Sequence, residues 1–384
     1  MTLPAWARRP GAVAIQAAVL LAVVVLVAMA AANAATNLGR LGINAGFGFL
    51  GRPTGFAISQ SLIPYSETST YLRALEVAAL NTIVLALLSA ALATPIGFAV
   101  GIGRRSSNGL VSALATGYVE VIRNVPLLLQ LFFWYFAMLR PLPPPRQSLS
   151  LLGMGFLSVR GLALPWPQAE PGFAIVVGAL VVGILLAVLA VALLAHRRAT
   201  AGAAPPAWPA LLGLVAGPPL LAAIVEGFPL RWELPHLSGF NFEGGVLVQP
   251  ELVAMTLALA FYSAAYIAEI VRAGLDAVPR GQVEAARALG LKPRTVSARI
   301  VVPQSLRVIL PPLGNEYLRL FRNTTLAPAI AYPDLTLIFA GTALNQTAQP
   351  FEVMVIVCAA YLAINLAASM AINAYNRHLA RFAR

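Results

Sequence analysis

Three acid–base pairs lie within apolar stretches of this chain, each with its members three residues apart. They are Glu120 with Arg123, Glu269 with Arg272, and Glu316 with Arg319. Residues at this spacing share a helix face and can neutralise each other. Ionisable groups in an apolar environment are costly and default to functional candidates. Each pair is therefore either an internal ion pair or part of a path for a polar solute.

The stretch 303–327 favours the path, because it is too polar to face lipid. Pro311 and Pro312 can break its helix and free backbone groups for the same path. Polar side chains near Pro126 are weaker candidates of the same kind. The predicted path residues are Asn124, Gln130, Glu316, Arg319, Asn323 and Thr324.

No catalytic constellation accompanies these charges. The three histidines, His196, His236 and His378, are scattered, and Cys358 is the only cysteine. A metal site needs clustered ligands, so we predict no metal site and no catalytic residue. A membrane-bound enzyme would need a nucleophile–base or metal arrangement, and this sequence offers neither.

The composition indicates what kind of protein carries these pairs. Of 384 residues, 59% are hydrophobic and 10% charged, and the mean hydropathy is +0.80. Soluble domains are about 45–50% apolar and about 25% charged, so a polytopic membrane protein is predicted. The formal net charge of +12 is read as cationic cytoplasmic loops and not as a nucleic-acid surface.

Eight stretches can form membrane-spanning helices, each of which needs about 20 mostly apolar residues. The candidates are 13–32, 72–101, 111–139, 172–195, 209–226, 252–272, 303–327 and 352–374. We predict an all-α fold with a first helix and outer segment over 1–70, a transmembrane domain over 71–375 and a tail over 376–384. The outer stretches, including 33–70, show too little regular pattern to predict a folded domain.

Basic residues set the orientation. The positive-inside rule places both ends in the cytoplasm, because arginines gather on one side of the eight spans, from Arg8 and Arg9 to Arg384. The first span has a second interpretation. Its basic start and the Ala32-Asn33-Ala34 sequence are also typical of a cleaved signal peptide, although its apolar run is longer than a usual signal core.

The loop between the sixth and seventh spans has the most specific pattern. Between Pro279 and Pro293, residues Gln282 to Leu289 can form two helical turns. Gln282, Ala285, Ala286 and Leu289 would share one face, and Gly290 suits the position after a helix end, where φ is often positive. Two central alanines make a poor lipid anchor, since such anchors use large apolar residues. A docking surface for another protein is predicted instead.

The same residues resemble a known family. Glu284-Ala285-Ala286, Gly290 and, twelve residues later, Val302-Pro303 match the EAA motif of the membrane subunits of ABC importers, except that the motif's leucine is Val302 here. The flanks 72–139 and 251–375 resemble the polar amino-acid branch of these permeases. With the extra first helix and an insertion over 140–250, the layout is similar to permeases of general L-amino-acid systems.

This resemblance implies a five-helix permease core of the type I importers. The EAA loop would be a coupling helix that docks on a separate cytoplasmic ATPase, with Gly281, Glu284, Ala285, Ala286, Leu289, Gly290 and Pro303 as its contact and shaping residues. The chain has no phosphate-binding loop of its own, so ATP and Mg²⁺ would bind the ATPase dimer. A periplasmic amino-acid-binding protein and a second, related permease would complete the importer in the bacterial inner membrane.

The resemblance also gives the charge pairs a use. An amino acid carries an ammonium and a carboxylate, so Glu316 and Arg319 could bind both ends. The alternative function is an ion-coupled secondary carrier that works alone. It would need carboxylates free to bind a proton or sodium, and each candidate has an arginine nearby.

Overall fold

The computed structural model of the chain describes residues 10–40, 46–201 and 208–381. The predicted charged ends Arg8, Arg9 and Arg384 lie outside these residues. The described chain divides into two units, Met1–Tyr135 with Ala254–Arg384, and Phe136–Val253.

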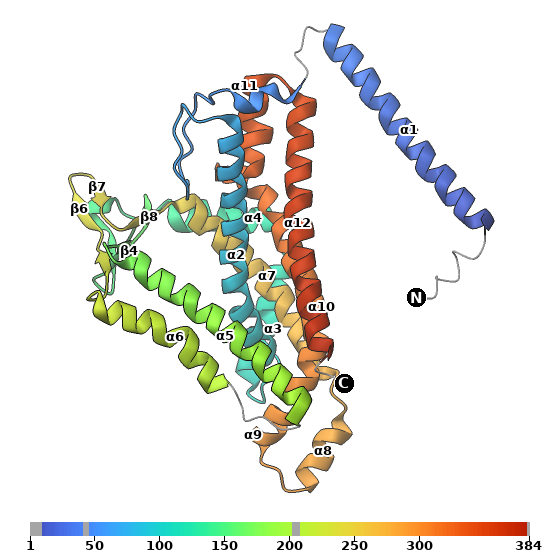
Figure 1. Cartoon of the computed structure of the whole chain (residues 1–384), viewed down its shortest axis with the longest axis vertical. Helices are drawn as coiled ribbons and strands as arrows, with labels where there is room; N and C mark the ends of the chain where they lie inside the picture. Colours follow the sequence, from blue (N-terminus) through green and yellow to red (C-terminus); the bar gives the residue numbers. More distant parts are fainter. Residues whose placement is uncertain (1–9, 41–45, 202–207, 382–384) are drawn as a thin grey trace. The chain divides into compact units, whose positions relative to one another are not determined.

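Unit 1 is built mainly of helices (Figure 1), two of which, at 133–139 and 250–276, cross the boundary with unit 2. Its long helices are α1 (Pro10–Arg40), α2 (Tyr71–Gly103), α3 (Gly109–Asn124), α7 (Pro250–Asp276), α10 (Val302–Asn323) and α12 (Pro350–Arg381). Its short helical segments are η2 (Phe47–Gly51), α4 (Leu127–Phe132), η3 (Phe133–Leu139), α8 (Arg280–Ala288), α9 (Pro293–Val296), η5 (Ser297–Val301), η6 (Thr324–Ile330), η7 (Thr336–Ala343) and α11 (Leu344–Thr347).

A helix lies at each of the eight predicted spans, but the number eight is not confirmed. Among the described residues, α2, α5, α7 and α12 are long and apolar enough to cross a membrane. The bent pair of α3 with Leu127–Leu139 makes a fifth candidate. The apolar parts of α1 and α6 are shorter, and α10 carries too many polar residues. Length and hydropathy alone therefore do not identify every predicted span.

The predicted span 111–139 is not one straight helix. It breaks at Val125-Pro126, where α3 and the following helix meet at 106°. Proline has no N–H to donate to the carbonyl four residues earlier, which is Ile122. The Gln130 side chain replaces that donor, because its Nε2 donates to the Ile122 oxygen at 2.8 Å and to the Val125 oxygen at 2.9 Å. Gln130 thus stabilises the bend.

Glycines bring α2 and α7 into close contact. A Cβ atom added to Gly97 would lie 2.6 Å from the Ile267 side chain, and one added to Gly101 would lie 2.7 Å from the Ala268 carbonyl oxygen. Small residues four positions apart let helix backbones approach in membranes, where association depends on packing. The pair of helices is surrounded by a buried apolar cluster that includes Ala93, Ile309 and Leu313.

We expect Gly101→Val to destabilise the protein by about 3 kcal/mol, since overpacking typically costs about 1–3 kcal/mol and a carbonyl oxygen cannot rotate away. Thermal unfolding in detergent, followed by size-exclusion chromatography, measures the effect. Gly117→Val is the matched control, because a Cβ there meets nothing within 4 Å. Equal midpoints for the two variants would contradict the packing argument.

The outer segment before α2 is packed, although the sequence shows too little regular pattern there to predict a folded domain. Phe49 is 1% exposed and lies in a cluster with Tyr71 and Phe339. The Tyr65 hydroxyl donates to the Phe56 carbonyl at 2.9 Å and lies 2.7 Å from the Thr54 hydroxyl. Burial raises the pKa of Tyr65 above its ordinary value, which favours the protonated hydroxyl that donates this bond. The aromatic residues of 46–70 thus fix the segment to the helix ends.

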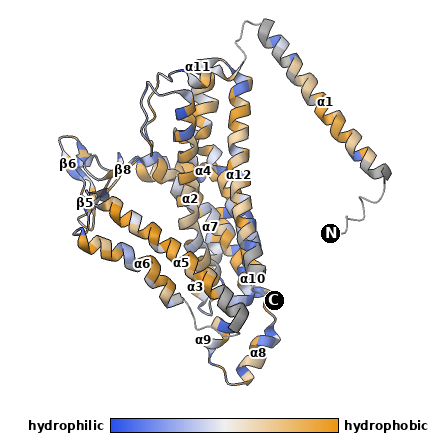
Figure 2. Ribbon diagram, in the orientation of Figure 1, coloured by the Kyte–Doolittle hydropathy of each residue, from blue (hydrophilic) through white to orange (hydrophobic). Residues whose placement is uncertain are grey.

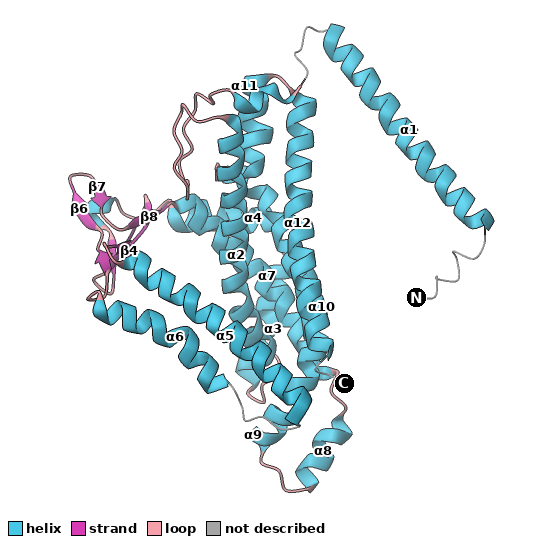
Figure 3. Cartoon of the chain, in the orientation of Figure 1, coloured by secondary structure: helices cyan, strands magenta, loops and turns pink. Residues whose placement is uncertain are grey.

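Unit 2 contains a helical hairpin and short strands. The hairpin is α5 (Phe173–Ala201) and α6 (Trp208–Val225), and Figure 2 shows both as hydrophobic over most of their lengths. The strands, together in one small region (Figure 3), are β1 (Leu149–Leu151), β2 (Gly155–Ser158), β3 (Gly161–Leu164), β4 (Trp166–Ala169), β5 (Leu230–Glu233), β6 (His236–Ser238), β7 (Asn241–Glu243) and β8 (Val246–Val248).

The outer stretches within unit 2 form short strands, although the sequence shows too little regular pattern there to predict a folded domain. One antiparallel sheet has the order β1-β2-β3-β8, and two further ribbons pair β4 with β5 and β6 with β7. Glycines with positive φ stand at the turns, among them Gly153 before β2 and Gly239 between β6 and β7. Strands of three or four residues are too short for alternation to be visible in the sequence.

Candidate functional site

The connection from α7 to α10 contains the predicted loop helix. It is α8, which Pro279 precedes as its N-cap. Gly290 has φ +76°, and its N–H donates to the Arg287 carbonyl at 2.9 Å, while the Leu291 N–H donates to the Ala286 carbonyl at 3.2 Å. This pair of bonds is the Schellman motif, which requires a left-handed residue. The predicted conformation of Gly290 is confirmed.

The predicted face of α8 is partly wrong. Ala286 is 4% exposed and turns toward the protein, whereas Leu289 is 81% exposed. The half-buried Val283, three residues before Ala286, completes the inner stripe, because a helix on a protein surface must bury one side. The Gln282 side chain accepts a hydrogen bond from Gln304 Nε2 at 2.7 Å. The exposed face consists of Gly281, Glu284, Ala285, Ala288 and Leu289.

Gly290 and Pro303 are also exposed, Pro303 at the start of α10. The structure thus places six of the seven predicted loop residues at the surface and buries Ala286. An exposed stripe of small residues with one carboxylate and one leucine at its edges can fit closely against another protein.

An ion-pair network lies where α7 ends, three residues before α8 begins. The predicted pair of Glu269 with Arg272 is present, and Glu269 also binds Arg104 at the end of α2. Asp276 binds Arg272 at 2.7 Å and Arg105 at 3.2 Å. The sequence analysis missed Arg104 and Arg105 as partners, since the pairing depends on the contact of α2 with α7. The network joins the ends of these two helices.

A second charged cluster lies within unit 1. Glu316 is 6% exposed and binds Arg319 at 2.6 Å. The Arg319 guanidinium lies 3.5 Å from the centre of the Tyr266 ring, and the Tyr262 and Tyr266 hydroxyls are 3.1 Å apart. A cation over a ring face is attracted by the ring's charge distribution. The structure thus gathers one acid, one base and two tyrosines from α7 and α10.

Arg123 lies beside this cluster instead of pairing with Glu120. It lies 5.0 Å from the centre of the Tyr266 ring, and in the part of the chain that the structure describes no ion pair links it to Glu120. The three predicted acid–base pairs are therefore not equivalent: two form, and the third arginine turns to an aromatic ring. Tyr262 and Tyr266 could have been found from their spacing of four on a helix that also carries Glu269.

The other predicted path residues do not gather around Glu316 by any contact seen among the described residues. Gln130 is committed to the bend after α3, and Thr324 is fully buried with its hydroxyl donating to the Phe321 carbonyl at 2.8 Å. Asn124 is exposed at the end of α3, and Asn323 is half-buried at the end of α10. Of the predicted path residues, Glu316 and Arg319 are the two that form the cluster.

Asp334 is a buried carboxylate that the sequence analysis missed. It is fully buried, accepts from the Leu337 N–H at 2.7 Å, and accepts from the Tyr361 hydroxyl at 3.1 Å. A carboxylate at a helix start satisfies free backbone donors, and Pro333 before it was an available signal. Asp334 links η7 to α12 and has a structural role.

Comparison with known proteins matches residues 93–381 to the family described as the binding-protein-dependent transport system inner membrane component. A putative amino-acid ABC transporter permease protein, YhdX of Escherichia coli (strain K12), is 47% identical over 91% of this chain and 88% of its own length. The general L-amino acid transport system permease protein AapQ of Rhizobium johnstonii is 46% identical over 94% and 91%. A permease protein of a glutamate/glutamine/aspartate/asparagine transport system, BztB of Rhodobacter capsulatus, is 35% identical over 90% and 88%.

Proposed function

This chain belongs to the family of inner-membrane components of binding-protein-dependent transport systems, and from this premise we propose that it moves L-amino acids across the bacterial inner membrane as the permease subunit of an ABC importer. The chain is a transport subunit and not an enzyme, and ATP is hydrolysed by a partner chain. The alternative prediction of an ion-coupled carrier that works alone does not agree with this membership.

The relatives support amino acids as the substrate class. Two of them, both close to half identical over nearly the whole chain, are named as amino-acid permeases, and one of these belongs to a general L-amino-acid system. The two alignments cover 91% and 94% of this chain, so they extend beyond the permease core into the 140–250 insertion. We therefore assign a broad range of L-amino acids to this chain, selected by a separate periplasmic binding protein.

The coupling element in this proposal is α8. Its exposed stripe of Glu284, Ala285 and Leu289 contacts the ATPase, and Gly290 holds the end of the helix in the required turn. The ion-pair network behind it ties α8's attachment point to the ends of α2 and α7. A displacement of α8 by the ATPase would reach these two helices directly. This exposed, firmly capped helix is the observation that carries the coupling mechanism.

The Glu316–Arg319 pair serves the translocation path. A zwitterion needs one partner of each sign, and Tyr262 and Tyr266 offer hydroxyls and ring faces to a side chain beside it. The substrate would exchange with the internal ion pair, so that neither charge is left unpaired when the path is empty. Asn323, one turn beyond Arg319 on α10, is a further contact of this path.

The full importer then contains this chain, a second related permease, two ATPase subunits and the binding protein. We assign the ends of α2 and α7, with α8, to the cytoplasmic side, and with them both chain termini.

Uptake measurements test the proposal. Proteoliposomes with the permease pair and ATPase, given ATP inside and the binding protein outside, should accumulate labelled L-amino acids and not their D-enantiomers. A matched preparation lacking ATP should show background uptake, and a proton or sodium gradient should not replace ATP. Accumulation by this chain alone along an ion gradient would overturn the proposed function.

A further inference from the structure

A groove of about 890 Å³ lies between α8 and the ends of α2 and α3. Its floor is apolar and includes Ile102, Val111, Leu275, Val283 and Val296. Of the coupling stripe of α8, Glu284 also lines the groove, whereas Ala285 and Leu289 do not. The groove is therefore a second feature of the region, with its own chemistry.

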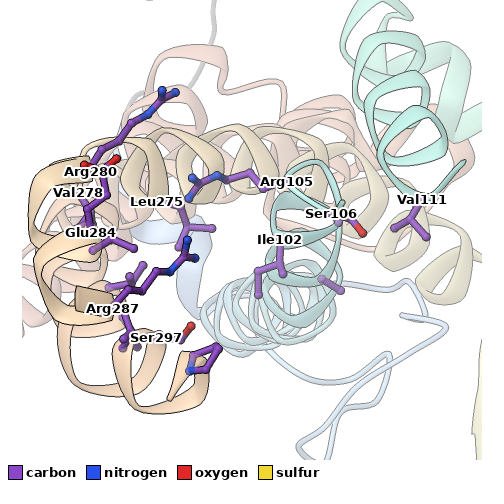
Figure 4. A pocket seen from close by; sticks show the side chains of 17 residues that line it. Ile102, Arg105, Ser106, Val111, Leu275, Val278, Arg280, Glu284, Arg287 and Ser297 are labelled. Atoms are coloured by element: carbon purple, nitrogen blue, oxygen red, sulfur yellow. The ribbon is translucent and has the colours of Figure 1, made fainter. Parts of the chain in front are cut away.

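Cations surround this apolar floor. Arg105, Arg280 and Arg287 line the groove against one acid, Glu284. Figure 4 shows Arg105, which follows α2, and Arg287 of α8 pointing toward the same space from opposite sides, with Leu275 between them. Arg105 shares its charge with Asp276 at 3.2 Å, while Arg287 has no ion-pair partner among the described residues. The groove keeps an excess of positive charge.

The groove continues onto an apolar surface. Ile102 and Val111, which line it, are 57% and 43% exposed, and Leu110 and Leu114 on α3 are 69% and 66% exposed. These residues belong to helices that we place in the membrane, so exposed leucines there face acyl chains. An amphiphile can enter the groove from the bilayer without crossing water.

We propose that this groove binds one anionic phospholipid, with its phosphate between Arg105 and Arg287 and its acyl chains on the apolar floor. Basic pockets between membrane helices on the cytoplasmic side bind acidic head groups, and arginine pairs with phosphate through several N–H donors at once. A free phosphate would leave the apolar floor exposed to water, so the lipid is the better match to the whole lining.

Native mass spectrometry of the purified permease with its ATPase tests the proposal, using phosphatidylglycerol and phosphatidylcholine of equal chain length as probes. Each surface arginine contributes about 1 kcal/mol toward anionic lipid. Two arginines therefore predict that phosphatidylglycerol binds about thirtyfold more tightly. The double variant Arg105→Gln/Arg287→Gln should bind both lipids equally. Arg294→Gln, on α9 and outside the groove, should keep the preference.

Three results would overturn the proposal. Equal binding of the two lipids by the unmodified protein would remove the electrostatic argument. This measurement needs no variant, so it does not depend on whether a variant folds. Displacement of the lipid by millimolar glycerol phosphate would assign the site to a free phosphate. Binding that appears only after the ATPase is removed would mean that the ATPase covers the groove. Each result is independent of amino-acid uptake, so it leaves the proposed function unaffected.

Discussion

Gly290→Val should reduce ATP-driven amino-acid uptake to background while the protein still inserts into the membrane. At φ +76° a side chain costs about 1–2 kcal/mol, and a β-branched residue is a particularly poor fit. A Cβ at this position meets nothing within 4 Å, so the cost falls on the local backbone and not on the fold. The Schellman bonds would open, and the exposed face of α8 would turn away from the ATPase.

Gly109→Val is the control for this experiment. It makes the same substitution at the start of α3, where a Cβ also meets nothing within 4 Å and φ is not positive. Uptake in proteoliposomes and ATPase retention during purification should be lost with Gly290→Val and kept with Gly109→Val. Normal uptake by Gly290→Val would remove α8 from the coupling mechanism.

Glu316→Gln should have the second large effect, on both stability and transport. The Arg319 side chain is 32% exposed, so the charge that remains is only partly desolvated, and losing the ion pair costs about 1.5–3 kcal/mol. Arg319, at 3.5 Å from the Tyr266 ring centre, would keep only its aromatic contact. Loss of a charged hydrogen bond to the substrate, worth about 1.5–3 kcal/mol, predicts uptake lower by about ten- to a hundredfold.

The double variant Glu316→Gln/Arg319→Gln separates the two effects. It removes both charges, so the thermal midpoint should recover much of the loss seen in either single variant. Uptake should stay low if the pair binds the substrate. A double variant with recovered midpoint and full uptake would show that the pair only stabilises the helices, and the path would have to lie elsewhere.

Local chemistry predicted much of the coupling region. Two prolines and one glycine bound α8 in the sequence, and these residues act through their own backbone geometry, whatever surrounds them. The pair of Glu269 with Arg272 followed from spacing on one helix. Both inferences need no knowledge of neighbouring elements, and both agree with the structure.

Other features depend on contacts between distant segments and could not be read from spacing. Ala286 was assigned to the docking face, but the packing of α8 against the rest of the protein buries it. The ion pairs of Arg104 and Arg105 depend on the contact of α2 with the end of α7, and the spacing of residues along the sequence does not show this contact. The Gln130 side chain was interpreted as a path residue. Its actual role is to replace the missing Pro126 N–H, and that role cannot be recognised until the bend is known.

The contact of α2 with α7 has a mechanical consequence. Gly97 and Gly101 let the backbones touch over the last two turns of α2, and the ion pairs of Arg104 and Arg105 fasten the same two helices directly beyond this contact. Because the close packing and the ion pairs adjoin, α2 and α7 are clamped together at this one end and cannot slide past each other there. Three residues separate the end of α7 from α8, so a force applied to α8 acts on this clamp and moves the ends of both helices together.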